Sequence, residues 1–155
     1  MSGILSGSDT RRINLSEFPT KLELGCGEKR NPECIGLDMV DFGQEIVWNI
    51  DNGIPLPDNS ISYVYSSHFV EHLDERQIEN LFLELVRVCQ NGAIFESRCP
   101  SDRTILRYYT NHFSQWNEDR VKGICQGWNY GNGRLEVLEM HEDSVELFFK
   151  IRILK

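Results

Sequence analysis

The sequence predicts an α/β fold with a mostly parallel sheet and an antiparallel end. Five short runs of β-forming residues occupy the first part of the chain, one amphipathic segment interrupts them, and two further β-type runs close the chain. Buried strands joined by a crossover helix indicate parallel neighbours, whereas two runs joined by a short turn indicate an antiparallel hairpin.

The first elements rest on clear local patterns. Residues 74–89 are expected to form a helix, because apolar residues recur there at helical spacing and Asp74 followed by Gln77 resembles a capping box. The strands expected around this helix are residues 21–24, 35–38, 46–48, 62–66 and 93–97.

The remaining chain is expected to contain a short helix, a long loop and a hairpin. The short helix follows the fifth strand and would be capped by Ser101 or Asp102. Residues 115–133, punctuated by Gly and Asn, have the composition of a loop, and long loops in small domains are often functional sites. Residues 134–140 and 145–154 are expected to form the hairpin.

Length and composition indicate a single domain. A chain of 155 residues, 40% of them hydrophobic, can bury one core, so we expect an N-terminal arm over residues 1–20 and one domain over residues 21–155. No apolar segment is long enough to span a membrane and the N-terminus does not resemble a signal peptide, so a cytoplasmic location is expected. The net charge of -8 disfavours a nucleic acid partner.

The cysteines do not indicate a metal or a disulfide framework. There are five of them, an odd number, with no C-x-x-C pair, and most stand among apolar residues. Reduced thiols in such positions pack as small hydrophobic groups, and we expect neither zinc nor disulfides from them.

The stretch LELGCG, residues 22–27, points to a ligand. Gly25 and Gly27 allow the backbone to turn sharply off a strand and to approach a bound molecule closely. Asp38 closes the next expected strand, where a carboxylate can accept hydrogen bonds from the ribose hydroxyls of a nucleotide. The two glycines and this acid together indicate a nucleotide-type ligand.

Residues 21–102 resemble the class I S-adenosylmethionine-dependent methyltransferases. The resemblance lies in the ordered succession of LELGCG, IGLD, NIDNGIPLPDNSISYVYSSHFVEHL and RVCQNGAIFESRCPSD. It points to the type 11 group, in a short form with a loop in place of the first helix. It implies a Rossmann-like sheet, mostly parallel with an antiparallel last strand and reduced helices on one face, and S-adenosylmethionine as the cofactor.

The same resemblance implies the residues that hold the cofactor. Asp38 would bind the ribose, Met39 would flank the adenine, and residues 49–51 would lie at the adenine edge. Residues 66–68 would form the wall that faces the methyl group. The implied cofactor-binding residues are Glu23, Gly25, Cys26, Gly27, Asp38, Met39, Asn49, Ile50, Asp51, Ser66 and His68.

The sequence departs from the family pattern at four places. Asn49 stands where an aspartate is common, Ser62 replaces an aspartate, and QNGA at residues 90–93 replaces a Pro-Gly-Gly turn. The fourth departure concerns the cofactor loop. Glu28 stands in place of the third glycine, so the helix N-terminus that would receive the cofactor carboxylate is expected to be missing. The connections 25–34 and 39–45 are too short to hold a full crossover helix. One sheet face is therefore expected to expose an apolar patch, covered by the N-terminal arm, by the Gly/Asn loop or by a second subunit of a homodimer.

His68 and Glu71 are the candidate catalytic residues. They stand at a strand end in SSHFVEHL, where a histidine can take a proton from an acceptor hydroxyl. Alternatively, His68 shapes the pocket while Glu71 and His72 brace the following helix. H-x-x-E-H also resembles one inverted zinc-protease arrangement, but here it straddles a strand-to-helix turn instead of lying on a helix, so no metal is expected.

These features favour a methyltransferase that acts on a small polar acceptor, for which the resemblance implies a sugar or glycoconjugate precursor. Aromatic and amide side chains in residues 107–113 and 127–133 are expected to contact the acceptor, unless they only pack the loops. The alternative is a non-catalytic S-adenosylmethionine-binding or partner-binding module. A nicotinamide-dependent oxidoreductase is disfavoured, because GCGEKR lacks the remaining glycine of that fingerprint and the helix that it opens.

Overall fold

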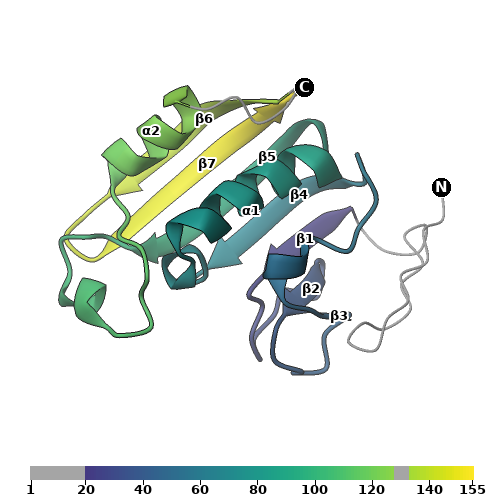
Figure 1. The fold of residues 1–155 in the computed structure, drawn as a ribbon, viewed down its shortest axis with the longest axis horizontal. Coiled ribbons are helices and arrows are strands. Elements are labelled where there is room, and N and C mark those ends of the chain that lie inside the picture. The colour runs from purple at the N-terminus through teal and green to yellow at the C-terminus, as the bar shows by residue number, and fades with distance from the viewer. Residues whose placement is uncertain (1–19, 128–132) are drawn as a thin grey trace.

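Seven strands form one sheet in the order β3-β2-β1-β4-β5-β7-β6 (Figure 1). The computed structural model describes residues 20–127 and 133–155, so the predicted arm lies outside the described residues except for Thr20. The strands are β1 (Lys21–Leu24), β2 (Ile35–Asp38), β3 (Ile46–Val47), β4 (Ile61–Ser67), β5 (Cys89–Pro100), β6 (Arg134–Glu142) and β7 (Glu146–Leu154).

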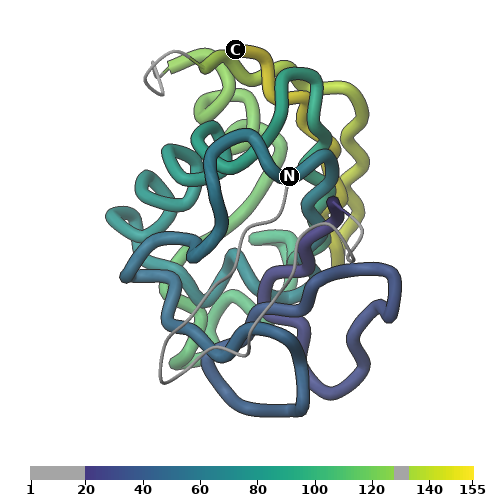
Figure 2. Tube along the Cα trace, turned by 90° about the vertical axis from the view of Figure 1, so that its right-hand side faces the viewer, coloured from purple at the N-terminus to yellow at the C-terminus, as the bar shows by residue number. Residues whose placement is uncertain are grey.

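Two α-helices pack on the same face of this sheet, which the side view shows clearly (Figure 2). They are α1 (Glu75–Val88), between β4 and β5, and α2 (Glu118–Gly127), between β5 and β6. Three short 3₁₀ helices lie in the connections: η1 (Ile50–Asn52), η2 (Val70–His72) and η3 (Ile105–Tyr108). None of the helices in the described ranges is long and apolar enough to cross a membrane.

The pairing of the strands confirms the predicted topology. β1 pairs in parallel with β2 and β4, β2 with β3, and β4 with β5. β7 is antiparallel to both β5 and β6, and with β6 it forms the predicted hairpin. The sheet is therefore mostly parallel with an antiparallel last strand, as expected.

The core lies between the sheet and the two helices, where aromatic rings connect the layers. Phe82 of α1 packs edge to face on Phe95 of β5, with ring centroids 5.9 Å apart, and Phe95 packs similarly on Phe149 of β7 at 5.8 Å. Trp116, just before α2, stacks on Phe149 at 5.8 Å. Such pairs add a geometric preference to the free energy of apolar burial.

The start of α1 confirms the predicted capping box. The Asp74 carboxylate accepts the Gln77 backbone N–H at 2.8 Å, and the Gln77 side-chain oxygen accepts the Asp74 backbone N–H at 2.9 Å. Two backbone donors that lack partners within the helix are thereby satisfied.

We expect Asp74→Ala to lower the free energy of unfolding by about 1 kcal/mol, because it removes the cap acceptor. For a domain of this size that corresponds to a fall of about 2–4 °C in Tm, measurable by thermal denaturation followed by circular dichroism. The control is Glu79→Ala, an exposed site in the same helix, which should leave Tm within about 1 °C because surface substitutions outside caps cost little. Equal losses in the two variants would contradict the role of the cap.

The connections 25–34 and 39–45 contain no helix, which confirms the sequence-based prediction. These loops instead fold across one face of β2. A Cβ on Gly36 would lie 3.0 Å from both Cys26 Sγ and Gln44 Cβ, so both loops press directly on the strand. The fully buried Gln44 side chain donates to the Val40 carbonyl oxygen at 2.8 Å, which closes the second loop.

The same sheet face over β4, β5 and β7 is polar, so the expected apolar patch is wrong for this part of the sheet. Tyr63 donates to Glu96 at 2.7 Å, and Lys150 lies 3.4 Å from Glu96 and 3.3 Å from Glu139. Outward side chains alternate with core side chains along each strand, and the outward ones include the charged Glu96 and Lys150. Cover by the N-terminal arm lies outside the described residues, and cover by a second subunit stays a prediction.

The long loop expected over residues 115–133 is also wrong in its first half, where α2 forms. The Asn117 side chain accepts the Arg120 backbone N–H at 2.8 Å, two acidic residues occupy the first turn, and Val121 is buried. These contacts outweigh the helix-breaking tendency of Gly123. Residues 128–132 lie outside the described part of the chain.

The short helix after the fifth strand exists as η3, but its cap differs from the prediction. The Thr104 hydroxyl accepts the Leu106 backbone N–H at 3.4 Å. The two predicted caps have other partners: Ser101 donates to Glu142 at 2.7 Å, and Asp102 accepts from Asn117 at 2.7 Å. These bonds connect Ser101 to β6 and Asp102 to the residue before α2. The Thr104 hydroxyl therefore caps η3 in their place.

Candidate active site

A cavity of about 370 Å³ lies at the carboxyl ends of β1, β2, β3 and β4. This is the edge at which ligands bind in open α/β sheets. The residues that line it are Gly25, Leu37, Asp38, Met39, Trp48, Asn49, Ile50, His68, Phe69, His72, Leu73 and Gln77. The structure therefore brings together six of the predicted cofactor residues: Gly25, Asp38, Met39, Asn49, Ile50 and His68.

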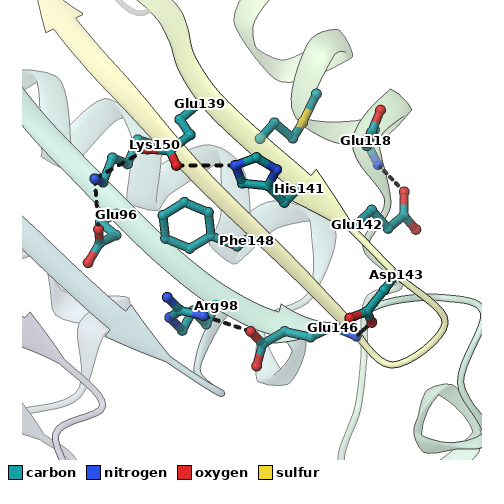
Figure 3. Close-up of a pocket in the computed structure, with 11 residues that line it drawn as sticks. Glu96, Arg98, Glu118, Glu139, His141, Glu142, Asp143, Glu146, Phe148 and Lys150 are labelled. Carbon is teal, nitrogen blue, oxygen red and sulfur yellow. Dashed lines mark hydrogen bonds and ion pairs between the residues drawn. The ribbon is translucent and has the colours of Figure 1, made fainter.

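A larger hollow of about 610 Å³ lies over the β5, β6 and β7 strands and shares no lining residue with this cavity (Figure 3). Its charged side chains pair with each other: Arg98 with Glu146 at 2.8 Å, and His141 with Glu139 at 3.1 Å. None of the predicted site residues lines it. The smaller cavity is therefore the candidate functional site.

The glycine loop shapes one wall of the cavity. Gly25 has φ +61°, and a Cβ there would lie 2.6 Å from Cδ2 of Phe69, which lines the same cavity. Only glycine satisfies both the left-handed backbone and the close approach of that ring. Gly27 also has a positive φ, of +58°, so the chain turns away from β1 through two glycines, as predicted.

Asp38 holds this loop in place while it faces the cavity. Its Oδ2 accepts the Gly27 backbone N–H at 3.0 Å, and its Oδ1 accepts the Val40 backbone N–H at 3.0 Å. A carboxylate oxygen has capacity for more than one hydrogen bond, so both oxygens retain lone pairs for a ligand. Asp38 can thus bind ligand hydroxyls in a fixed orientation.

The segment after β3 forms the opposite wall. The Asn49 side chain accepts the Asp51 backbone N–H at 2.9 Å and begins η1, which places Asn49 and Ile50 at the cavity. Asp51 instead accepts a hydrogen bond from Gln77 of α1 at 2.8 Å and does not line the cavity. Of the three predicted adenine-edge residues, the structure places two at the wall.

Three further predicted residues lie behind the walls. Glu23 accepts the Asn31 backbone N–H at 2.6 Å, and its burial raises the pKa of its carboxyl. Burial raises the pKa of the Cys26 thiol to about 12, so this thiol stays protonated. Ser66 is fully buried and shares a hydrogen bond of 2.9 Å with Ser97. These side chains support the cavity from behind, as does Gly27.

His68 stands where β4 turns into η2. Its φ of +52° is unusual for a residue with a side chain and marks a constrained turn, of the kind that clusters at functional sites. Its Nδ1 lies 3.5 Å from Oε1 of Glu71, and 56% of its side chain is exposed. Glu71 is buried and does not line the cavity, and burial raises the pKa of its carboxyl. Of the two candidate catalytic residues, only His68 faces the cavity.

Sequence reasoning missed several lining residues. Trp48 follows a strand of only two residues, and Phe69 lies inside the motif that supplied His68. Their aromatic character after a strand end was the available signal. Leu73, which lies between η2 and α1, and Gln77, in the first turn of α1, carried no such signal, because their approach to the cavity depends on how α1 packs.

The expected acceptor loop, residues 107–113, reaches the rim of the cavity. The His112 ring packs against the His72 ring, with centroids 4.9 Å apart, and against the Tyr109 ring at 5.4 Å. Tyr109 and Phe113 are mostly exposed, with 55% and 65% of their surface accessible. Residues 128–132 of the second expected acceptor segment lie outside the described residues.

Comparison with known proteins shows which proteins the chain resembles. The family model described as a methyltransferase domain matches residues 29–96. A sequence search of curated proteins gives no match to the chain. The solved structures that resemble it are similar in fold at low sequence identity, which makes the fold the shared property.

A SAM-dependent methyltransferase from Archaeoglobus fulgidus is 18% identical, with a TM-score of 0.64 over 89% of this chain and 87% of that chain. The N-methyltransferase NodS from Bradyrhizobium japonicum WM9 is 16% identical, with a TM-score of 0.62 over 87% and 85% of the two chains. An S-adenosylmethionine-dependent methyltransferase from Mesorhizobium loti is 12% identical, with a TM-score of 0.62 over 85% and 90%. The predicted fold is confirmed.

Proposed function

We propose that this chain, which has the fold of the class I S-adenosylmethionine-dependent methyltransferases and matches a methyltransferase-domain model over residues 29–96, transfers a methyl group to a small polar acceptor. The resemblance inferred from the sequence is thereby supported, together with S-adenosylmethionine as the cofactor. The observation that carries the proposal is one cavity built from four strand ends, which holds Gly25, Asp38, Asn49 and His68.

The residues of the cavity fit this cofactor. Leu37, Trp48 and Ile50 provide an apolar surface suited to a purine ring, and Asp38 provides a carboxylate suited to ribose hydroxyls. Because Gly25 has no Cβ, the Phe69 ring packs directly on its backbone, and the backbone of Gly25 itself lines the cavity where the amino-acid part of the molecule would lie. These side chains would bind and orient the cofactor, with Glu23, Cys26, Gly27, Asp51 and Ser66 supporting them from behind.

S-adenosylmethionine, when bound, supplies an electrophilic methyl group. The contribution of the chain is to hold the acceptor in line with that group and to keep water away, which are the main demands of such a displacement. Phe69 and Trp48 exclude water from the cavity walls. His68 faces the cavity with an exposed ring and would accept the proton of an acceptor hydroxyl, while Glu71, 3.5 Å away, positions that ring.

The rim of the cavity supports a proposal for the acceptor class. Exposed Tyr109 and Phe113, next to His112, offer stacking surfaces and polar edges of the kind that recognise sugar rings and small amines. We propose a small polar acceptor, with sugars and glycoconjugate precursors as the first class to screen. A non-catalytic module that only binds S-adenosylmethionine is the alternative, favoured by the absence of a helix after Gly27 within the described loop.

We expect S-adenosylhomocysteine to bind with a stoichiometry of one per chain in isothermal titration calorimetry, and NAD to give no saturable heat under the same conditions. The reason is that the glycine loop of the cavity wall lacks the third glycine and the following helix of a dinucleotide site. Saturable NAD binding without S-adenosylhomocysteine binding would contradict the proposal. A screen of sugars, amines and carboxylates for S-adenosylhomocysteine formation then separates an enzyme from a binding module.

A further inference from the structure

Glu71 has a buried carboxylate with no hydrogen bond. Its side chain is 3% exposed, and neither Oε1 nor Oε2 has a hydrogen-bond partner among the described residues. Two ring nitrogens lie close to its Oε1: His68 Nδ1 at 3.5 Å and His72 Nε2 at 3.8 Å. An ionised carboxylate in such a place is costly unless a positive charge compensates it.

The neighbouring His72 presents a lone pair to that carboxylate. Its Nδ1 lies 2.8 Å from the carbonyl oxygen of Asn111. A carbonyl oxygen can only accept, so Nδ1 carries the hydrogen, and Nε2 of the neutral ring is an acceptor that faces Glu71. Two electron-rich atoms that face each other repel unless a proton or a metal cation lies between them. A backbone carbonyl behind the ring is also how metal-binding histidines are usually oriented.

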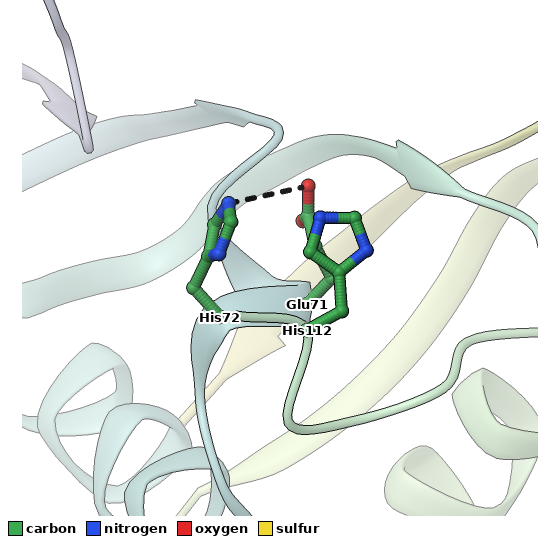
Figure 4. A group of neighbouring side chains, drawn as sticks. All are labelled: Glu71, His72 and His112. Atoms are coloured by element: carbon green, nitrogen blue, oxygen red, sulfur yellow. Dashed lines mark ion pairs between the residues drawn. The ribbon is translucent and has the colours of Figure 1, made fainter. Parts of the chain in front are cut away.

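His112 completes the group from a distant part of the chain (Figure 4). Its ring meets the His72 ring at 82°, and one ligand atom from each of Glu71, His72 and His112 lies within 4.8 Å of the others. The loop that carries His112 is fixed to the Glu71 turn, because the Glu71 carbonyl oxygen accepts the backbone N–H groups of Phe113 at 2.8 Å and Ser114 at 3.2 Å.

We propose that Glu71, His72 and His112 form a binding site for one divalent transition-metal cation of the Zn²⁺ type. Two imidazoles and one carboxylate are a ligand set that Zn²⁺ accepts, and three protein ligands leave a fourth position open to water or to another ligand. With metal–ligand bonds of about 2.0–2.2 Å, ligand atoms in a tetrahedral site lie about 3.5 Å apart. Closing the present spacing therefore takes side-chain movements of about 1 Å.

The motif at residues 68–72 holds only two of the three proposed ligands, so it could not indicate a metal site by itself. Two of its members bind from the strand-to-helix turn, and the third ligand comes from the loop after η3. The inference does not depend on methyl transfer, because His72 and His112 have no assigned contact with the cofactor. Since His72 also lines the cavity, the cation would lie at the rim, beside the expected acceptor loop.

The test uses the full chain, freed of any affinity tag, treated with EDTA and titrated with Zn²⁺ in a calorimeter. We expect one cation per chain, and we expect His112→Ala and His72→Ala each to weaken Zn²⁺ binding by at least about 100-fold, because each removes one of three ligands and loss of even a hydrogen-bond partner of a ligand costs about 10–100-fold. Titration with Co²⁺ should give visible absorption bands of a four-coordinate ion in the parent that are lost in both variants. Circular dichroism spectra will show that the variants are folded.

The matched control is His141→Ala, an exposed histidine on β6 that pairs with Glu139 and lies outside the group. It should bind Zn²⁺ like the parent. If the parent takes up no Zn²⁺ saturably, or if His112→Ala and His72→Ala bind as the parent does, the site does not exist and Glu71 is neutralised by a proton alone. S-adenosylhomocysteine binding is measured in the same samples, so that failure of the metal site and failure of the proposed function are told apart.

Discussion

Replacement of Asp38 by alanine is expected to remove most of the stabilisation that S-adenosylhomocysteine gives to the protein. Asp38 is the carboxylate of the cavity wall, and hydrogen bonds to a charged group contribute about 1.5–3 kcal/mol each, so its loss should weaken binding by up to about 100-fold. A ligand at 100 times its Kd stabilises the native state by about 2.7 kcal/mol, and a 100-fold weaker ligand at the same concentration by about 0.4 kcal/mol. Thermal denaturation with and without the ligand measures the difference.

Asp38 also holds Gly27 and Val40, so each variant must be compared with its own ligand-free Tm. Asp41→Ala is the matched control, because it removes an exposed carboxylate from the same loop and outside the cavity. Asp38→Asn keeps one acceptor oxygen and should give an intermediate shift. A ligand-induced shift in Asp38→Ala as large as in the parent would remove Asp38 from the ligand contact.

Replacement of His68 by glutamine is expected to lower turnover by about two to four powers of ten, the range typical of general acid-base groups, while S-adenosylhomocysteine binding stays within about 2-fold. His68 faces the cavity from a turn with φ +52°, so the ring can be removed while Asp38 and the glycine loop stay in place. The measurement is S-adenosylhomocysteine formation with the acceptor found by screening, together with calorimetric binding for each variant.

His68→Asn is the second variant, because asparagine tolerates a positive φ better than most residues and so controls for strain at the turn. His141→Ala, an exposed histidine far from the cavity, should keep full turnover. If turnover and cofactor affinity fall together in both His68 variants, the residue only shapes the pocket. Full turnover in both would show that the acceptor loses its proton without His68.

Much of the fold could be predicted because it depends on local patterns. β1 and β2 have the predicted bounds, and α1 begins at the predicted cap, because glycine loops, strand-end acids and capping boxes are written in adjacent residues. The cavity was predicted in part for the same reason: Gly25, Asp38 and His68 each follow a strand end, and parallel strands bring these ends to one edge.

The errors arose where tertiary contacts decide the outcome. α2 forms although Gly123 and Gly127 interrupt its sequence, because Val121 is buried against the core. The polar sheet face depends on cross-strand pairs such as Lys150 with Glu96, which join strands far apart in the sequence. His112 could not be connected with Glu71 from the sequence, since the loop that unites them is fixed only in the folded chain.

Because the strands differ in length, β5 and β7 are held together by many more hydrogen bonds than β2 and β3. β5 and β7 pair continuously from residues 94 to 100, whereas β2 and β3 pair only at Leu37 and Asp38. Opening of β2 and β3 breaks few hydrogen bonds, so these strands can unfold locally while β5 and β7 exchange their amide hydrogens only on global unfolding. The cavity lies at the ends of the short strands, so a bound ligand would stabilise them. Its binding would slow local opening of β1 to β3 and bring the amide hydrogen exchange rates of β2 and β3 closer to those of β5 and β7.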